Sequence, residues 1–117
     1  MSSGGSLVKK SEIVVVLTTF PMDADVTTFA STIIREHLSA CVTTHPKVQS
    51  VYLWEGKIVQ EKEQQVVFKT TKDRLEILWN RIRQLHPYEV PEFLVLPIID
   101  GNPAYLNWIR QSTEISN

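Results

Sequence analysis

Short β-branched runs alternate along the chain with segments in which apolar residues recur every three or four positions. Residues 13–17 are mostly β-branched and flanked by polar residues, so they predict a strand that ends at residues 18–21. Asp23 or Asp25 then has the position of a helix N-cap, since a carboxylate accepts from the free N–H groups of a first turn. Six apolar residues at helical spacing predict the buried face of this helix: Val26, Phe29, Ala30, Ile33, Ile34 and Leu38.

A long hairpin is predicted in the middle of the chain. Residues 41–54 have an extended pattern that is interrupted near His45-Pro46, because proline cannot donate to a sheet ladder. Glu55-Gly56 has the composition of a tight hairpin turn, with glycine at the position of positive φ. Residues 58–71 are expected to return as the partner strand.

The last third of the chain predicts a helix, an edge strand and a final short helix. Lys72-Asp73 opens the helix and Pro87 ends it. Its buried stripe is expected to consist of Leu75, Leu78, Trp79, Ile82 and Leu85. Residues 93–99 predict the fourth strand, and Pro97 within it indicates a sheet edge. After a break at residues 101–103, the final helix is predicted from Tyr105, Leu106, Trp108 and Ile109.

The order of these elements predicts an α+β fold. Two split βαβ units make a ferredoxin-like βαββαβ sandwich, here followed by a C-terminal helix. Helices then cover one face of the sheet, and the other face should carry polar residues. The runs at residues 13–17, 66–68 and 93–96 are instead apolar on both faces, and the tail helix could cover only part of them. A partner subunit is the more economical cover, so the pattern predicts a homo-oligomer.

Composition adds bounds on domain number and partners. The 117 residues predict a single domain over residues 11–117 after a flexible tail at residues 1–10. A formal net charge of −1 gives no reason to expect nucleic acid or a membrane surface as partner. One cysteine, Cys41, excludes an internal disulfide, and the first apolar run is too short for a signal peptide or a membrane span. The chain is therefore expected to be cytoplasmic.

Six sequence stretches occur in a specific order and at a specific spacing: Leu38–Val42, Tyr52–Lys57, Phe68–Thr71, His86–Glu92, Leu94–Pro97 and Gly101–Trp108. Together they resemble the CutA divalent-cation-tolerance family across residues 12–110. The resemblance implies a ferredoxin-like subunit in a compact, unusually stable homotrimer. It also implies an association with tolerance to copper and other divalent cations, and no enzymatic reaction.

His86 is the candidate metal ligand. In copper-associated relatives, the proposed ligands are a thiol at the end of the first strand and two adjacent histidines before Pro-Tyr. Here Thr18 occupies the strand-end position and Leu85 precedes His86, so one of the three ligands remains. One imidazole does not make a site, and the alternative is a helix-terminal histidine that bonds a free carbonyl. We therefore expect no required cofactor, and at most weak binding of Cu(II) or another divalent cation.

A second candidate site is a polar cleft between subunits, formed by Trp54, Lys69, Tyr88 and Glu92. Lys69 lies on an otherwise apolar strand and needs water or a partner, and Glu89 and Glu92 are its nearest candidates by motif. One interpretation is a structural ion-pair network at a subunit interface. The other is a cleft that binds a small anion. The charged run at residues 61–63 is expected to lie on a solvated strand edge.

Catalytic and nucleic-acid-binding patterns are not recognisable in the chain. No nucleophile and base have a catalytic spacing, so no catalytic residue and no enzyme are predicted. Cys41 lacks the second thiol of a copper carrier and is expected to be a buried small hydrophobe.

The main hypothesis is a cytoplasmic, trimeric CutA-like protein of divalent-metal, especially copper, tolerance or homeostasis. The alternative is a trimeric signalling or scaffold protein that binds a small anionic ligand between subunits.

Overall fold

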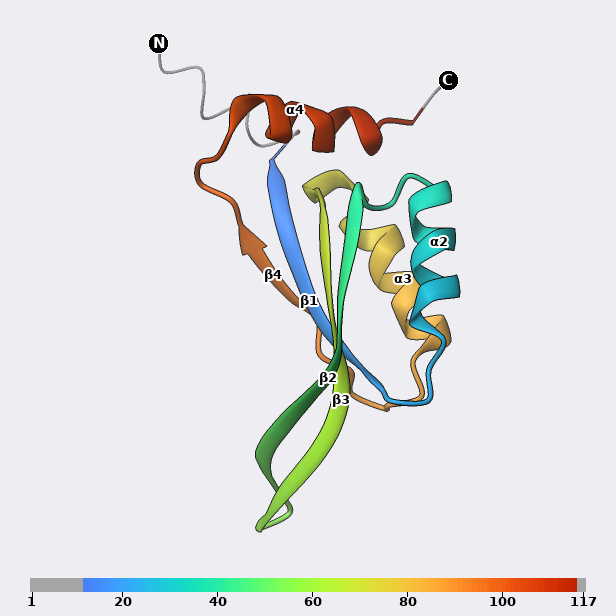
Figure 1. The fold of residues 1–117 in the computed structure, drawn as a ribbon, viewed down its shortest axis with the longest axis vertical. Coiled ribbons are helices and arrows are strands. Elements are labelled where there is room, and N and C mark those ends of the chain that lie inside the picture. Colours follow the sequence, from blue (N-terminus) through green and yellow to red (C-terminus); the bar gives the residue numbers. More distant parts are fainter. Residues whose placement is uncertain (1–11, 116–117) are drawn as a thin grey trace.

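A computed structural model describes residues 12–115, in which a four-stranded sheet carries helices on one face and at one end (Figure 1). The strands are β1 (Ile13–Pro21), β2 (Cys41–Trp54), β3 (Lys57–Thr71) and β4 (Leu94–Pro97). The helices are α2 (Val26–Arg35), the 3-10 turn η1 (Lys72–Arg74), α3 (Leu75–Leu85) and α4 (Pro103–Ser112). The predicted order of elements is confirmed. The predicted tail at residues 1–10 lies outside the described residues.

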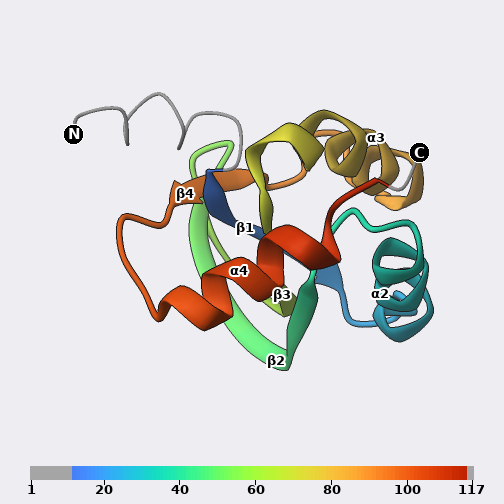
Figure 2. The same cartoon turned by 90° about the horizontal axis from the view of Figure 1, so that it is seen from above.

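The sheet has the strand order β2-β3-β1-β4, and each neighbouring pair is antiparallel. β4 is an edge strand, as Pro97 predicts. The helices α2 and α3 lie side by side against one face, while α4 crosses the ends of the strands (Figures 1 and 2). The fold is therefore α+β, as expected. Within residues 12–115, no helix is long and apolar enough to span a membrane.

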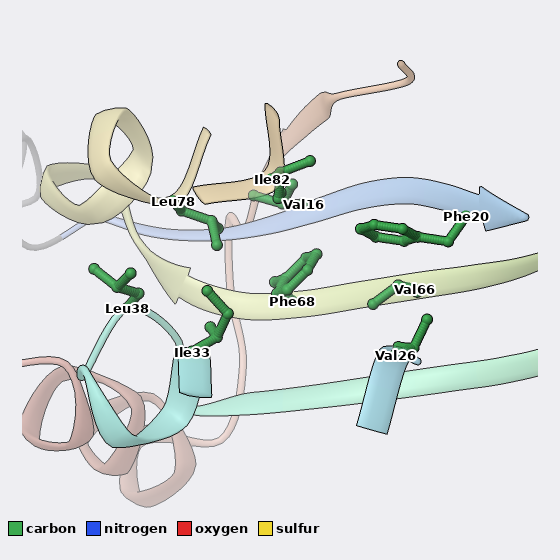
Figure 3. Packing of buried hydrophobic residues seen from close by; sticks show 9 residues of the cluster. All are labelled: Val16, Phe20, Val26, Ile33, Leu38, Val66, Phe68, Leu78 and Ile82. Carbon is green, nitrogen blue, oxygen red and sulfur yellow. The ribbon is translucent and has the colours of Figure 1, made fainter. Parts of the chain in front are cut away.

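The main core lies between the sheet and the helices α2 and α3 (Figure 3). Its nine buried residues are Val16, Phe20, Val26, Ile33, Leu38, Val66, Phe68, Leu78 and Ile82. On β1 and β3 these are even-numbered, so the odd-numbered residues lie on the opposite face, because side chains alternate along a strand. We call this opposite side the open face. Its upper end is covered by α4, where Ile109 packs with Ile13 and Ala40.

The helix α2 begins at one of the two predicted N-cap residues. Asp25 is the N-cap, and its side chain accepts a hydrogen bond from the backbone N–H of Thr28. Two residues depart from the predicted buried stripes, since Ile34 is 40% exposed and Leu85 is 47% exposed. Both lie at the C-terminal end of their helix, where the apolar face leaves the sheet.

The central hairpin has the predicted turn and the predicted bounds of β2, while β3 begins one residue earlier than predicted. A register shift between His45 and Val48 marks the predicted interruption at Pro46. Glu55 and Gly56 both have positive φ, at 50° and 78°, which is the pattern of a type I′ turn. The far end of the hairpin extends beyond the rest of the sheet and gives the molecule its 52 Å length (Figure 1).

The strand ends agree with the prediction in one case and differ in another. β1 ends at Pro21, within the predicted residues 18–21, and its last four residues pair with residues 63–66 of β3. β4 is shorter than predicted and covers only residues 94–97.

Candidate functional site

His86 lies at the end of α3, with both ring nitrogens bonded inside its own chain. It caps the helix through its backbone N–H and is 8% exposed. Nδ1 accepts from the backbone N–H of Tyr88 at 3.2 Å, and Nε2 contacts the carbonyl oxygen of Thr19. This pattern fits a neutral imidazole with its proton on Nε2. The ring also stacks on Phe20, with 4.6 Å between ring centroids.

The geometry at His86 matches the helix-terminal alternative and restricts metal binding. A metal ion needs an imidazole lone pair, and the Nδ1 lone pair already accepts from Tyr88. A cation could bind there only after displacing this hydrogen bond. The role of His86 as a metal ligand remains a prediction.

The other two positions of the proposed ligand set are Thr18, which has a structural role, and Leu85, which is half exposed. Thr18 is fully buried, and its hydroxyl donates to the carbonyl oxygen of Glu92 at 2.6 Å. The neighbouring Thr19 contacts His86, so the end of β1 and the end of α3 do meet. Leu85, however, is half exposed. In the described part of the chain, no three His, Cys, Asp or Glu side chains are grouped so that they could hold a metal.

Carboxylates and tyrosines gather at the lower end of the sheet in a cluster that we call the acidic corner, formed by Glu61, Glu63, Glu92, Tyr52 and Tyr88. Tyr88 donates its hydroxyl to Glu63 at 3.1 Å, and Tyr52 donates to Glu61 at 2.7 Å. Burial, followed by the charge of Glu63, raises the pKa of Glu92. Burial, with the bond to Glu63, also raises the pKa of Tyr88. The corner therefore holds its tyrosines protonated beside carboxylates.

The expectation of a solvated charge run at residues 61–63 is wrong for Glu63. Its side chain lies on the inner strand β3 and is only 5% exposed. Glu63 is buried by a residue distant in the sequence, because Tyr88 from the segment after α3 packs against it. The sequence pattern did not predict Glu63 and Glu61 as members of the corner. The one available signal was that Glu63 shares the odd-numbered face of β3 with Lys69.

Lys69 is half-buried on the open face, and its predicted glutamate partners do not reach it within the chain. Its ammonium group is 3.4 Å from the hydroxyl of Tyr105 and 5.5 Å from the centroid of that ring. No carboxylate of residues 12–115 lies within ion-pair distance of it. Glu92 instead lies near Glu63, at the other end of the open face.

One chain alone does not assemble the predicted cleft. Tyr88 and Glu92 both lie beside Glu63. Trp54 is 59% exposed next to the hairpin turn. A cleft that needs more than one chain remains a prediction.

Cys41 and a surface groove beside α2 add no chemistry to these sites. Cys41 is half-buried rather than buried, and its sulfur is 3.8 Å from the hydroxyl of Thr43. A groove of about 540 Å³ lies between α2 and β2. It is lined by Thr27, Ala30, Ser31, Ile34, Arg35, Val42 and Thr44, and it includes none of the predicted site residues.

Comparison with known proteins identifies the family. The family model described as CutA1 divalent ion tolerance protein matches residues 14–112. The chain belongs to the CutA1 family. The divalent-cation tolerance protein CutA of Yersinia pestis (strain Pestoides F) is 45% identical over 105 residues, which cover 90% of this chain and 88% of that protein. The family description names ion tolerance and no enzymatic reaction.

Solved CutA1 structures have the same fold as this chain. CutA1 from Oryza sativa superposes with a TM-score of 0.84 at 38% identity, covering 92% of this chain and 99% of that one. The divalent cation tolerance protein of Thermus thermophilus gives a TM-score of 0.82 at 40% identity, covering 87% of this chain and 99% of that one. The resemblance found in the sequence is thus confirmed.

Proposed function

We propose that this chain is the subunit of a cytoplasmic homotrimer that acts in tolerance to divalent cations, especially copper, and catalyses no reaction. The match of the CutA1 family model over residues 14–112 carries this proposal. The relatives named divalent-cation tolerance proteins support it, since the similarity covers nearly the whole length of both chains. The proposal attributes to this chain the tolerance that their name describes.

The trimer and the ferredoxin-like assignment draw support from the sheet. The strand order β2-β3-β1-β4, with every pair antiparallel, is the order of a split βαβ sandwich. Within residues 12–115, no helix covers the open face below α4 (Figure 1), and β4 leaves Leu94 55% and Leu96 45% exposed on it. Exposed apolar surface of this kind is typical of a subunit interface.

Metal binding is proposed to be weak, with His86 as the candidate ligand. A copper ion at His86 would have to replace the hydrogen bond from Tyr88 and compete with the packing on Phe20. Both losses reduce the affinity. Titration calorimetry with Cu(II) is expected to show weak binding that His86→Ala weakens further, while His45→Ala, at an exposed position, leaves it unchanged. Equal affinity of His86→Ala and the unsubstituted protein would remove His86 from the site.

Tolerance itself is tested by growth. A bacterial strain that lacks its own CutA1 protein should regain growth at inhibitory Cu(II) when it expresses this chain. Expression of the folded protein without any gain in copper tolerance would contradict the proposed function. Chain levels are compared by immunoblot, so that poor expression is not mistaken for lack of function.

A further inference from the structure

We propose that the open face joins two copies of this chain head to tail, and that Lys69 of one copy pairs with the acidic corner of the next. The inference rests on the proposed homotrimer and specifies the contact that holds it in register. Three features of the open face support it. The centre is apolar, the upper end carries a cation that pairs with no carboxylate of residues 12–115, and the lower end carries carboxylates that pair with no cation of those residues.

The apolar centre is contributed by three neighbouring strands. Register places Val15 opposite Leu96 and Leu17 opposite both Leu94 and Val67. Cross-strand partners lie on the same face, so these five side chains form one continuous patch. Leu94 and Leu96 are about half exposed, although they lie beside strands of the same sheet. Burial of such a patch against a second copy removes apolar surface from water and therefore stabilises the assembly.

The upper end of the patch carries a cation without a carboxylate. Lys69 follows Val67 by two positions on the same face of β3, and it is half-buried. Its polar contact is the hydroxyl of Tyr105, which is neutral. A partly buried ammonium group gains little from a neutral partner and gains more from a carboxylate brought to it.

The lower end carries carboxylates without a cation. Glu63 is buried, and its hydrogen-bond donor is Tyr88 rather than a basic group. Glu92 lies close enough for the charge of Glu63 to act on it. No lysine or arginine of residues 12–115 forms an ion pair with either glutamate. Two neighbouring carboxylates, one of which is buried, favour the approach of a positive charge.

These opposite charges cannot meet within one chain. Glu63 and Lys69 are six residues apart on one extended strand, a separation of about 20 Å along the sheet. A second copy can bring its own Lys69 to the acidic corner while its apolar patch covers Leu94 and Leu96. Each copy then offers one cationic end and one acidic end, which permits a heterologous contact. Such contacts form a ring when the rotation between copies closes.

The charges would act mainly on register and partner choice. The apolar patch is nondirectional, whereas a buried pair disfavours arrangements that leave either charge unpaired. A metal cation in the acidic corner, or a small anion beside Lys69, would satisfy the same groups without a second copy. The experiment separates these occupants from the proposed contact.

Charge reversal tests the pairing directly. We compare Lys69→Glu, Glu92→Lys and the double variant with the unsubstituted protein, measuring the trimer fraction by native mass spectrometry over a dilution series. Lys62→Glu is the matched control, because Lys62 is on the same strand but on the opposite face. Glu92 is chosen over Glu63, whose bond to Tyr88 would also be lost.

Each single reversal is expected to raise the dissociation concentration of the trimer by at least about tenfold. The double variant should recover most of that loss, and Lys62→Glu should have little effect. A double variant that is as weak as the single variants together would overturn the proposed pair. An unsubstituted protein that is monomeric at every concentration would instead contradict the proposed homotrimer itself.

A cross-linking measurement does not depend on the folding of variants. Light and ¹⁵N-labelled chains are unfolded together, refolded and treated with a carbodiimide, which joins a lysine amine to a carboxylate with loss of water. A cross-link from Lys69 to Glu63 or Glu92 with one light and one heavy half is expected. Its absence from the assembled protein would overturn the inference. A trimer that forms only when Cu(II) or phosphate is added would also overturn it.

Discussion

At the scale of single residues, the contacts of His86 show that this candidate ligand also has a structural role. Its ring contacts three residues from two separate segments: Thr19 and Phe20 on β1, and Tyr88 after α3. A side chain with these contacts stabilises the corner whether or not a metal binds. The same ring is the candidate ligand, so metal affinity and stability are expected to be linked at this position.

The first prediction concerns the polar contacts of His86. His86→Phe keeps an aromatic ring against Phe20 but leaves the carbonyl of Thr19 and the N–H of Tyr88 without their partner. Unsatisfied buried groups cost stability, so the free energy of unfolding should fall by about 1–3 kcal/mol. Urea denaturation at one chain concentration measures this. His45→Phe, at an exposed position, is the control, and an equal loss in both variants would show that the buried contacts contribute nothing.

The site could be predicted from sequence only in part, because its partners are distant along the chain. Pro87 and the end of α3 correctly indicated a helix-terminal His86. Glu63 was expected in solvent because its neighbours are charged, yet Tyr88, 25 residues later, covers it. Glu89 and Glu92 were the candidate partners of Lys69 by motif, and within one chain its contact is Tyr105 on α4. Local pattern shows which face a side chain occupies but not which later segment packs on that face.

At the scale of secondary-structure elements, strong local signals determined the boundaries that were predicted correctly. The bounds of β2, its interruption and the turn at Glu55-Gly56 follow from proline and glycine, whose backbone preferences do not depend on tertiary contacts. The length of β4 was overestimated, because only residues 94–97 pair with β1. Strand length is set by the partner strand more than by its own residues.

The second prediction concerns the N-cap of α2. Asp25→Ala removes the acceptor for Thr28, so the urea midpoint should fall at neutral pH. The hydrogen bond from the Thr28 side chain, then that from its backbone, lowers the pKa of Asp25 below 3.8. Its stabilisation is therefore fully present above pH 3.8 and is lost as the pH falls through the lower, folded-state pKa. Asp23→Ala should be nearly neutral, and an equal effect at Asp23 would contradict the assigned cap.

The third prediction concerns the hairpin turn. Glu55 adopts a φ of 50°, which a non-glycine residue other than asparagine or aspartate adopts at a cost. Glu55→Asn should therefore stabilise the protein by a few tenths to about 1 kcal/mol. Gly56→Ala should destabilise it by about 1 kcal/mol, because a Cβ there meets no atom but strains a φ of 78°. Thermal unfolding measures both, and the same sign of change in both variants would contradict the type I′ turn.

At the scale of the whole molecule, one surface remains incompletely covered. The helices α2 and α3 cover one face of the sheet, and α4 covers only the upper end of the other (Figure 1). The remaining open face combines exposed leucines with opposite charges at its two ends. The two-sided apolar strands in the sequence already predicted a partner there. The charge arrangement could not be predicted, because it depends on which segments bury Glu63 and Lys69.

The fourth prediction is that assembly weakens in acid. In the separate chain, burial and then the charge of Glu63 raise the pKa of Glu92 above its usual value of 4.5. The other titratable groups of the acidic corner are Tyr88, Glu61 and Tyr52. A Lys69 from another copy would lower that pKa, so assembly would release protons. Stability of the trimer is then greatest above the pKa of the separate chain and is lost as the pH falls toward and below 4.5. Analytical ultracentrifugation from about pH 7 to about pH 4 measures this, and Glu92→Gln should reduce the dependence.

The most direct single measurement is the native mass of the unsubstituted protein at neutral pH and micromolar concentration. The open face and the CutA1 family assignment together predict the mass of three chains, with no tightly held copper after exchange into metal-free buffer. A mass of one chain under these conditions would contradict the account, because the apolar patch and its flanking charges would then remain without a partner.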